Sequence, residues 1–136
     1  MMKKIVSPQN VVEQYVETCQ ILKETALSGD YKRGNKEGRK IVKMFRILEN
    51  NIELANLSLP KLFCNKNVVT KSKAAAHCIA LNIRVSEAEK ILEEVANDDS
   101  YGIFRFNAEM TLKVWREQGY LKVYKEQIPR CSGSLD

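Results

Sequence analysis

Apolar residues recur every three or four positions along almost the whole chain, and no segment alternates between apolar and polar residues over the length of a strand. This spacing gathers the apolar side chains of each segment on one face of an α-helix. Only six of the 136 residues are glycine and three are proline, too few for a turn-rich β-sandwich. The sequence therefore predicts an all-α fold with five or six helices.

Capping residues indicate where some of these helices begin. Ser7 followed by Pro8 is typical of a helix N-terminus, because serine accepts a backbone hydrogen bond and proline fits the first helical position. A second helix is predicted over residues 35–55 from its apolar stripe. Ser86 and Glu89 have the spacing of a capping box, which predicts the start of a further helix.

The loops between the predicted helices are short, which favours antiparallel packing of neighbours. The chain is too short for several domains of ordinary size. We expect residues 1–122 to form a single helical domain. Residues 123–136 are expected to be a flexible C-terminal tail, because the chain becomes polar there.

A weak internal repeat relates two of the predicted helices. A shift of 34 residues places Ala74 on Ala108 and Leu81 on Trp115. A period of this length is typical of stacked helix pairs, in which each pair buries its apolar face against the next. An ordinary helical bundle is the alternative. In either case we expect Trp115 to be largely buried, because it shares the inward phase of Ala108 and Leu112.

Small and apolar residues at particular spacings carry a family resemblance. They are Gly29-Asp30-Tyr31, Gly34-Asn35-Lys36, Ala74-Ala75-Ala76 with Leu81, Ala88 with Ile91-Leu92, and Gly102, Ala108, Leu112, Trp115 and Gly119. With these residues, the chain from about position 10 to position 122 resembles a small, largely uncharacterised bacterial family of HEAT-like helical domains. The resemblance implies a compact α-superhelix of stacked helix pairs. Some similar proteins occur beside polymorphic or contact-dependent toxins and act as immunity proteins, so the resemblance also implies a toxin as partner.

No arrangement of residues in the sequence favours catalysis or metal binding. His77 is the single histidine, and adjacent residues of a helix point about 100° apart, so His77 and Cys78 do not face each other as a nucleophile and its base. The four cysteines include no CxxC spacing, which argues against a zinc site or a redox centre. We therefore expect a protein that is not an enzyme and that holds no metal or cofactor.

Nothing in the sequence predicts secretion or membrane insertion. The N-terminus is basic but lacks the apolar segment of a secretion signal. No stretch approaches the about 20 apolar residues that a membrane span needs. We expect a cytoplasmic protein with reduced thiols and no membrane partner.

The distribution of charge is more informative than the net charge of +5. Residues 32–46 carry seven cations against one carboxylate, whereas residues 87–99 carry six carboxylates against one lysine. Either segment alone is commonly a solvated helix face, but their segregation along the chain indicates binding. The cations that share one predicted helix face are Lys32, Lys36, Arg39, Lys43 and Arg46.

The first functional interpretation is a protein-binding module, most specifically an immunity protein that covers the active site of a cognate nuclease toxin. Such a toxin needs a cationic cleft to hold phosphates, so acidic residues flanked by aromatic side chains are suited to fill it. The predicted partner-binding residues are Glu93, Glu94, Asp98, Asp99, Tyr101 and Phe104.

The second interpretation is a nucleic-acid-binding HEAT-like scaffold whose basic residues 32–46 track the phosphates of RNA or DNA. This segment has few aromatic side chains for base stacking, and the acidic residues 87–99 repel phosphate. The sequence therefore favours a protein toxin over nucleic acid as the partner.

Overall fold

The computed structural model describes residues 7–123, which form six α-helices and two short 3₁₀-helices and contain no β-strand. The predicted all-α fold is confirmed. Residues 124–136, nearly the whole of the predicted tail, lie outside the described residues, as do residues 1–6. The elements in chain order are α1 (Pro8–Ser28), α2 (Tyr31–Glu49), α3 (Ile52–Ser58), η1 (Leu59–Leu62), α4 (Val68–Ala80), α5 (Val85–Ala96), η2 (Asp99–Tyr101) and α6 (Phe104–Gln118).

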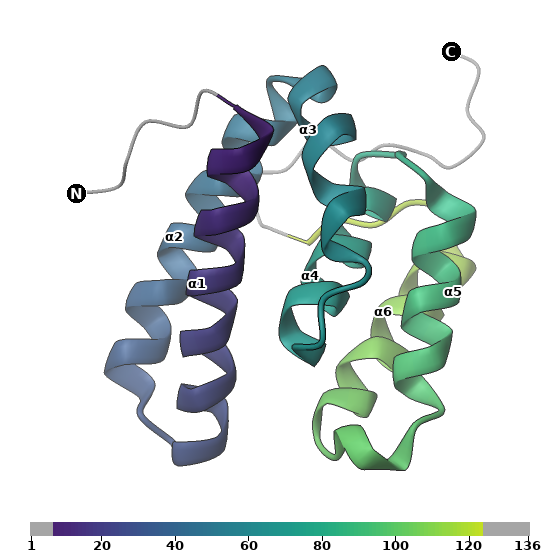
Figure 1. Cartoon of the computed structure of the whole chain (residues 1–136). Helices are drawn as coiled ribbons and strands as arrows, with labels where there is room; N and C mark the ends of the chain where they lie inside the picture. Colours follow the sequence, from purple (N-terminus) through teal and green to yellow (C-terminus); the bar gives the residue numbers. More distant parts are fainter. Residues whose placement is uncertain (1–6, 124–136) are drawn as a thin grey trace.

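Helix α4 lies at the centre of the molecule, between the α1–α2 hairpin and the α5–α6 hairpin (Figure 1). Nine of its thirteen residues are buried. The small side chains of Ala74, Ala75 and Ala80 are among them, and they allow neighbouring helices to approach closely. The expected antiparallel packing of neighbours is seen in both hairpins (Figure 1). Stacking as HEAT-like pairs stays a prediction.

The hydrophobic core continues from the α1–α2 hairpin through α4 to α5. Burying a single large apolar side chain contributes about 1.5–3 kcal/mol, so this set is the main source of stability. No helix within residues 7–123 is both long and apolar enough to cross a membrane. The largest fully buried apolar and aromatic side chains are Tyr15, Ile41, Met44, Phe45, Leu48, Leu59, Leu62, Ile79 and Leu92.

The first helix begins where the sequence predicts. The Ser7 side chain accepts a hydrogen bond from the backbone N–H of Asn10, and Pro8 occupies the first helical position. Gly29 ends the helix in a left-handed conformation with φ of 78°, which glycine adopts without strain. Local capping chemistry is therefore sufficient to define α1.

The prediction of one continuous helix over residues 35–55 is wrong, because the chain breaks between α2 and α3. The Asn50 side-chain amide donates to the backbone carbonyl of Arg46 at 2.9 Å. The Asn51 side-chain oxygen accepts from the backbone N–H of Leu54 at 3.1 Å and so caps α3. Asparagine side chains compete with the helical backbone in this way, and two in succession end one helix and start the next.

The predicted capping box of Ser86 and Glu89 is also wrong, because Ser86 lies within α5 and not before it. The residue before this helix is Arg84, whose backbone is left-handed with φ of 45° and whose side chain makes no capping bond. The tight turn after α4 sets this geometry, since the backbone N–H of Ile83 donates to the carbonyl of Cys78 at 2.8 Å.

Candidate functional site

His77 lies in the core of the protein. It shares a hydrogen bond with the Tyr15 hydroxyl, and its ring centroid is 4.7 Å from that of Phe45. Burial, together with the charge of Lys73, holds the pKa of His77 well below its usual range, so the ring is neutral near pH 7. This ring packs three helices together and does not face solvent.

The thiols of Cys19 and Cys78 are buried as well. Burial raises the pKa of each to about 12, so both are protonated at neutral pH and are weak nucleophiles. Within residues 7–123, no three His, Cys, Asp or Glu side chains gather closely enough to hold a metal ion.

The exposed cations of α2 form a continuous surface, which we name the basic face. Its members lie within about 80° of arc around the helix, opposite the buried Ile41 and Phe45. Two other cations of this helix are held by carboxylates: Lys40 by Glu37 at 2.9 Å, and Arg33 by a glutamate of α1. The basic face consists of Lys32, Lys36, Arg39, Lys43 and Arg46.

Four members of the basic face carry charge that no carboxylate offsets. Lys32, Lys36, Arg39 and Lys43 make no hydrogen bond or ion pair with any residue that the structure describes. Unpaired cations gathered on one helix face create a positive potential that extends into solvent. The structure therefore brings the predicted basic residues together.

The predicted acidic residues, by contrast, are partly engaged within the molecule. Glu93 accepts from Arg116 at 3.0 Å, and Asp99 is paired with Arg105. The hydroxyl and backbone N–H of Ser100 both donate to Asp98, at 2.7 and 3.0 Å, and lower the pKa of its carboxyl.

Glu94 is the member of the predicted set that is exposed and makes neither a hydrogen bond nor an ion pair within residues 7–123. The other carboxylates still count toward the long-range potential. The segment from Val85 to Gln118 carries eight carboxylates against four cations, so its net charge is −4. Helix α2 has seven cations against two carboxylates, a net charge of +5, and lies on the other side of α4 (Figure 1).

The two aromatic residues of the predicted site are half-buried and do not project from the surface. The Tyr101 hydroxyl accepts a hydrogen bond from the Lys71 amine at 2.6 Å, and this amine lies 4.8 Å from the centroid of the ring. Phe104 turns inward and lines a pocket. Neither ring is the exposed anchor that the sequence suggested.

The exposed apolar side chains near this loop lie instead along α6, on a surface that we name the α6 ridge. Ile103, Phe106, Met110 and Val114 are 61, 63, 41 and 37% exposed. Their spacing of three, four and four residues places them within about 80° of arc on one side of the helix. The ion pair of Asp99 with Arg105 joins the acidic loop to the start of this ridge.

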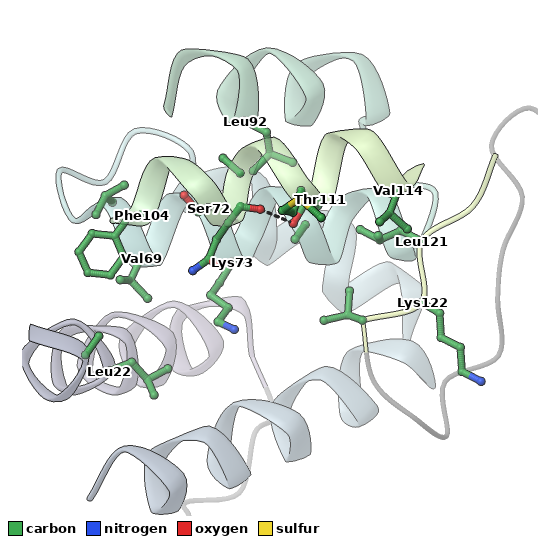
Figure 2. A pocket seen from close by; sticks show the side chains of 17 residues that line it. Leu22, Val69, Ser72, Lys73, Leu92, Phe104, Thr111, Val114, Leu121 and Lys122 are labelled. Carbon is green, nitrogen blue, oxygen red and sulfur yellow. Dashed lines mark hydrogen bonds between the residues drawn. The ribbon is translucent and has the colours of Figure 1, made fainter. Parts of the chain in front are cut away.

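A pocket of about 590 Å³ opens between α1, α4, α6 and the segment that follows α6 (Figure 2). Its walls are mostly apolar, and Met110 and Val114 of the α6 ridge form part of its rim. Two lysines, Lys73 and Lys122, line the pocket, and no carboxylate does.

Lys73 points into the pocket, whereas the Lys122 amine points away from it (Figure 2). The Lys73 amine makes no hydrogen bond or ion pair within residues 7–123. Burial lowers the pKa of Lys73, and the nearby Cys19 opposes this shift. The adjacent Ser72 hydroxyl, which also lines the pocket, is buried and has no partner in the described part of the chain.

The charge and motif patterns of the sequence do not identify the α6 ridge or the Lys73 pocket. The signal for the ridge is the apolar spacing from Ile103 to Val114, which resembles a core stripe. The signal for the pocket is Lys73, a charged residue directly before the Ala74–Ala76 run, in a helix whose other residues are mostly buried. Without the fold, neither signal shows whether these residues lie at the surface or in the core.

Comparison of the chain with known protein families, with curated proteins and with solved structures finds no match. Function is therefore inferred from three surfaces: the basic face of α2, the α6 ridge with the acidic loop beside it, and the Lys73 pocket.

Proposed function

We propose that the protein is a non-catalytic protein-binding module, and specifically an immunity protein that neutralises a cognate bacterial nuclease toxin of the contact-dependent or polymorphic kind. The observation that carries this proposal is the α6 ridge, an exposed apolar stripe on a helix whose hairpin has a net charge of −4. The toxin covers this ridge, and the acidic residues around it face the toxin's active site.

The composition of this surface supports a protein partner. Protein interfaces combine an apolar centre, which supplies most of the binding energy, with a polar rim that remains near solvent. The α6 ridge supplies an aromatic side chain at Phe106 and a flexible apolar one at Met110. Asp98 and Asp99 lie beside the start of the ridge, and Glu94 lies on the preceding helix.

The charge of the same surface supports a cationic partner. A nuclease holds the phosphates of its substrate with cations, so its active-site cleft attracts a surface of net negative charge. The pairs formed by Arg116 and Arg105 reduce the local charge of Glu93 and Asp99. We therefore assign the acidic residues mainly to steering and orientation, and the apolar ridge to affinity.

The test takes as candidate toxin the C-terminal domain of any secreted effector that is encoded next to this chain, and measures protection of cells from it and co-purification of the two proteins. Phe106→Ala combined with Met110→Ala should abolish protection and raise the dissociation rate by about 100-fold or more, because central apolar anchors carry most of the affinity. Leu27→Ala is the matched control, since Leu27 is another exposed apolar side chain and lies on α1. Equal protection by the double variant and the control contradicts the α6 ridge as the interface.

Binding of nucleic acid is the second candidate, and one observation favours it. Lys32, Lys36, Arg39 and Lys43 are unpaired within residues 7–123, and Tyr31 at the same end of α2 is 81% exposed. Cations track phosphates, and an exposed aromatic ring offers a base a stacking surface. This candidate uses residues of α2, whereas the α6 ridge lies on another helix, so variants of one surface leave the other intact.

A further inference from the structure

The pocket beside Lys73 has the composition of a binding site for an amphipathic anion. We propose that it binds a medium-chain free fatty acid, with the carboxylate on the Lys73 amine and the hydrocarbon chain against the apolar walls. This inference does not depend on the proposed function. Met110 and Val114 belong both to the α6 ridge and to the rim of the pocket, but the residues that would hold the head group, Lys73 and Ser72, lie on α4 and outside the ridge.

Charge complementarity identifies the head group. The Lys73 amine points into the pocket (Figure 2). No carboxylate lines the pocket, and the amine has no hydrogen-bond or ion-pair partner within residues 7–123. Lys73 is partly buried, an unpaired cation that is partly withdrawn from water is costly, and a ligand carboxylate relieves that cost. The other titratable groups close to this amine are Cys19 and His77, and both are neutral near pH 7, so neither competes for the site.

Two polar side chains near Lys73 can complete the recognition of a carboxylate. The Ser72 hydroxyl lines the pocket and is buried without a hydrogen-bond partner among the described residues. Asn107 of α6 also lines the pocket, and its side-chain amide offers two N–H donors. The neighbouring Thr111 hydroxyl is already engaged with the backbone carbonyl of Asn107 at 2.8 Å.

The walls identify the rest of the ligand. A volume of about 590 Å³ lies within the range of small-molecule sites. The lining is chiefly aliphatic, with a single aromatic ring at Phe104, so it suits a hydrocarbon chain and not a sugar or a nucleotide. The apolar lining residues are Leu22, Ala26, Val68, Val69, Ala76, Leu92, Phe104, Ala108, Met110, Val114, Leu121 and Val123.

The test compares binding of dodecanoate and dodecanol to the full-length, delipidated protein by titration calorimetry. The two probes share a chain, so their difference reports the carboxylate. We expect dodecanoate to bind saturably and dodecanol to bind about 10- to 100-fold more weakly, which is the usual contribution of a hydrogen bond to a charged group.

Substitutions locate the site. Lys73→Met keeps an unbranched side chain that is only one atom shorter and removes its charge, and it should reduce dodecanoate affinity by about 10- to 100-fold with little effect on dodecanol. Lys122→Met is the matched control, because the Lys122 amine points away from the pocket, and it should bind like the wild type. Asn107→Asp places a carboxylate at the wall with almost no change in shape, and it should also weaken dodecanoate binding.

Three results would overturn the proposal. The first is equal affinity for dodecanoate and dodecanol, and the second is wild-type affinity in Lys73→Met and Asn107→Asp. The third is the absence of saturable binding to the full-length protein, which includes the case in which residues 124–136 or a second copy occupy the pocket. Circular dichroism of each variant confirms that a loss of binding does not come from unfolding.

Discussion

The hydroxyl of Tyr15 on α1 and the ring of His77 on α4 share a hydrogen bond in the core, although the two residues are 62 positions apart in the chain. Their rings meet edge to face, with centroids 5.7 Å apart and planes at 81°. Phe45 of α2 packs on the same imidazole, so this cluster joins α1, α2 and α4. A polar pair that is satisfied in this way fixes one arrangement of the three helices.

The first prediction is that this cluster makes stability depend on pH. The pKa of His77 is well below its usual value in the folded protein, whereas the unfolded chain titrates near 6.5. Below that pH the unfolded state binds more protons than the folded state, so the free energy of unfolding falls as pH decreases. We expect a loss of up to about 1.4 kcal/mol per pH unit below pH 6.5, measured by urea unfolding between pH 7.5 and 5.

The sequence provides a clean control for this experiment, because His77 is the only histidine in the chain. His77→Gln keeps a hydrogen-bonding side chain and removes the titration. Its overall stability should be lower, because the aromatic packing with Phe45 is lost, but its stability should change little over the same range of pH. A wild-type protein whose stability is constant from pH 7 to pH 5.5 contradicts a neutral buried imidazole.

The second prediction concerns two glycines of α2 that differ in their surroundings. A Cβ atom at Gly34 would lie 3.0 Å from the Thr25 hydroxyl of α1, whereas a Cβ atom at Gly38 would meet nothing within 4 Å. Replacing glycine with alanine inside a helix stabilises it by about 0.5–1 kcal/mol when the site has room. We therefore expect Gly38→Ala to raise the free energy of unfolding by this amount.

Gly34→Ala should give none of that gain, because α1 and α2 must separate slightly to admit the methyl group. Thermal unfolding of the two variants measures the difference directly, and each serves as the control for the other. Equal stabilisation by both substitutions would contradict this prediction, because it would mean that α1 and α2 move apart at Thr25 with no loss of stability.

The fold is predictable from the sequence where a cap is local. Ser7 and Gly29 define α1 with no help from tertiary structure, and Gly119 ends α6 with φ of 82°. The break at Asn50 and Asn51 and the turn before α5 depend on which of several local hydrogen bonds prevails. Packing against other helices settles that competition, so the sequence pattern alone does not.

The candidate site is less predictable, because burial and ion pairing depend on contacts between distant residues. Arg116 reaches Glu93 across 23 positions of sequence. Gly102, with φ of 56°, separates η2 from α6 and turns Phe104 toward the pocket and Phe106 toward solvent.

The sequence predicts that Ala108, Leu112 and Trp115 face inward on α6. This prediction is confirmed for the first two residues and only in part for the third. Ala108 and Leu112 are buried as expected. Trp115 is only partly buried, although its indole nitrogen is buried and has no hydrogen-bond partner within residues 7–123. The prediction of a largely buried Trp115 is therefore wrong in degree.

The third prediction tests the nucleic-acid candidate. If the basic face binds RNA or DNA, affinity should fall steeply with salt. Replacing Lys36, Arg39 and Lys43 with glutamine should then reduce the slope of log K against log salt by nearly one unit for each lost phosphate contact. The matched control replaces Lys40 with glutamine, because Lys40 is paired with Glu37 and is not part of the basic face. Absence of any retention on heparin or RNA at low salt excludes this candidate.

The fourth prediction separates steering from affinity at the acidic end of the molecule. Replacing Glu93, Glu94, Asp98 and Asp99 with lysine should slow association with the toxin by at least about tenfold and abolish protection, because the approach of a cationic cleft then becomes unfavourable. The fold should survive this change, since these side chains are exposed and exposed ion pairs contribute little to stability.

Within that set, Glu94→Lys alone is the sharpest variant, because Glu94 is exposed and holds no ion pair within residues 7–123. It should slow association measurably and leave the dissociation rate unchanged, since it alters the field around the α6 ridge and not the apolar contacts. Glu17→Lys makes the same change of charge at an exposed position of α1 and serves as the control. Stopped-flow association at low and high salt distinguishes the two variants. If they slow association equally, net charge alone governs the encounter, and the acidic end of the molecule does not face the toxin.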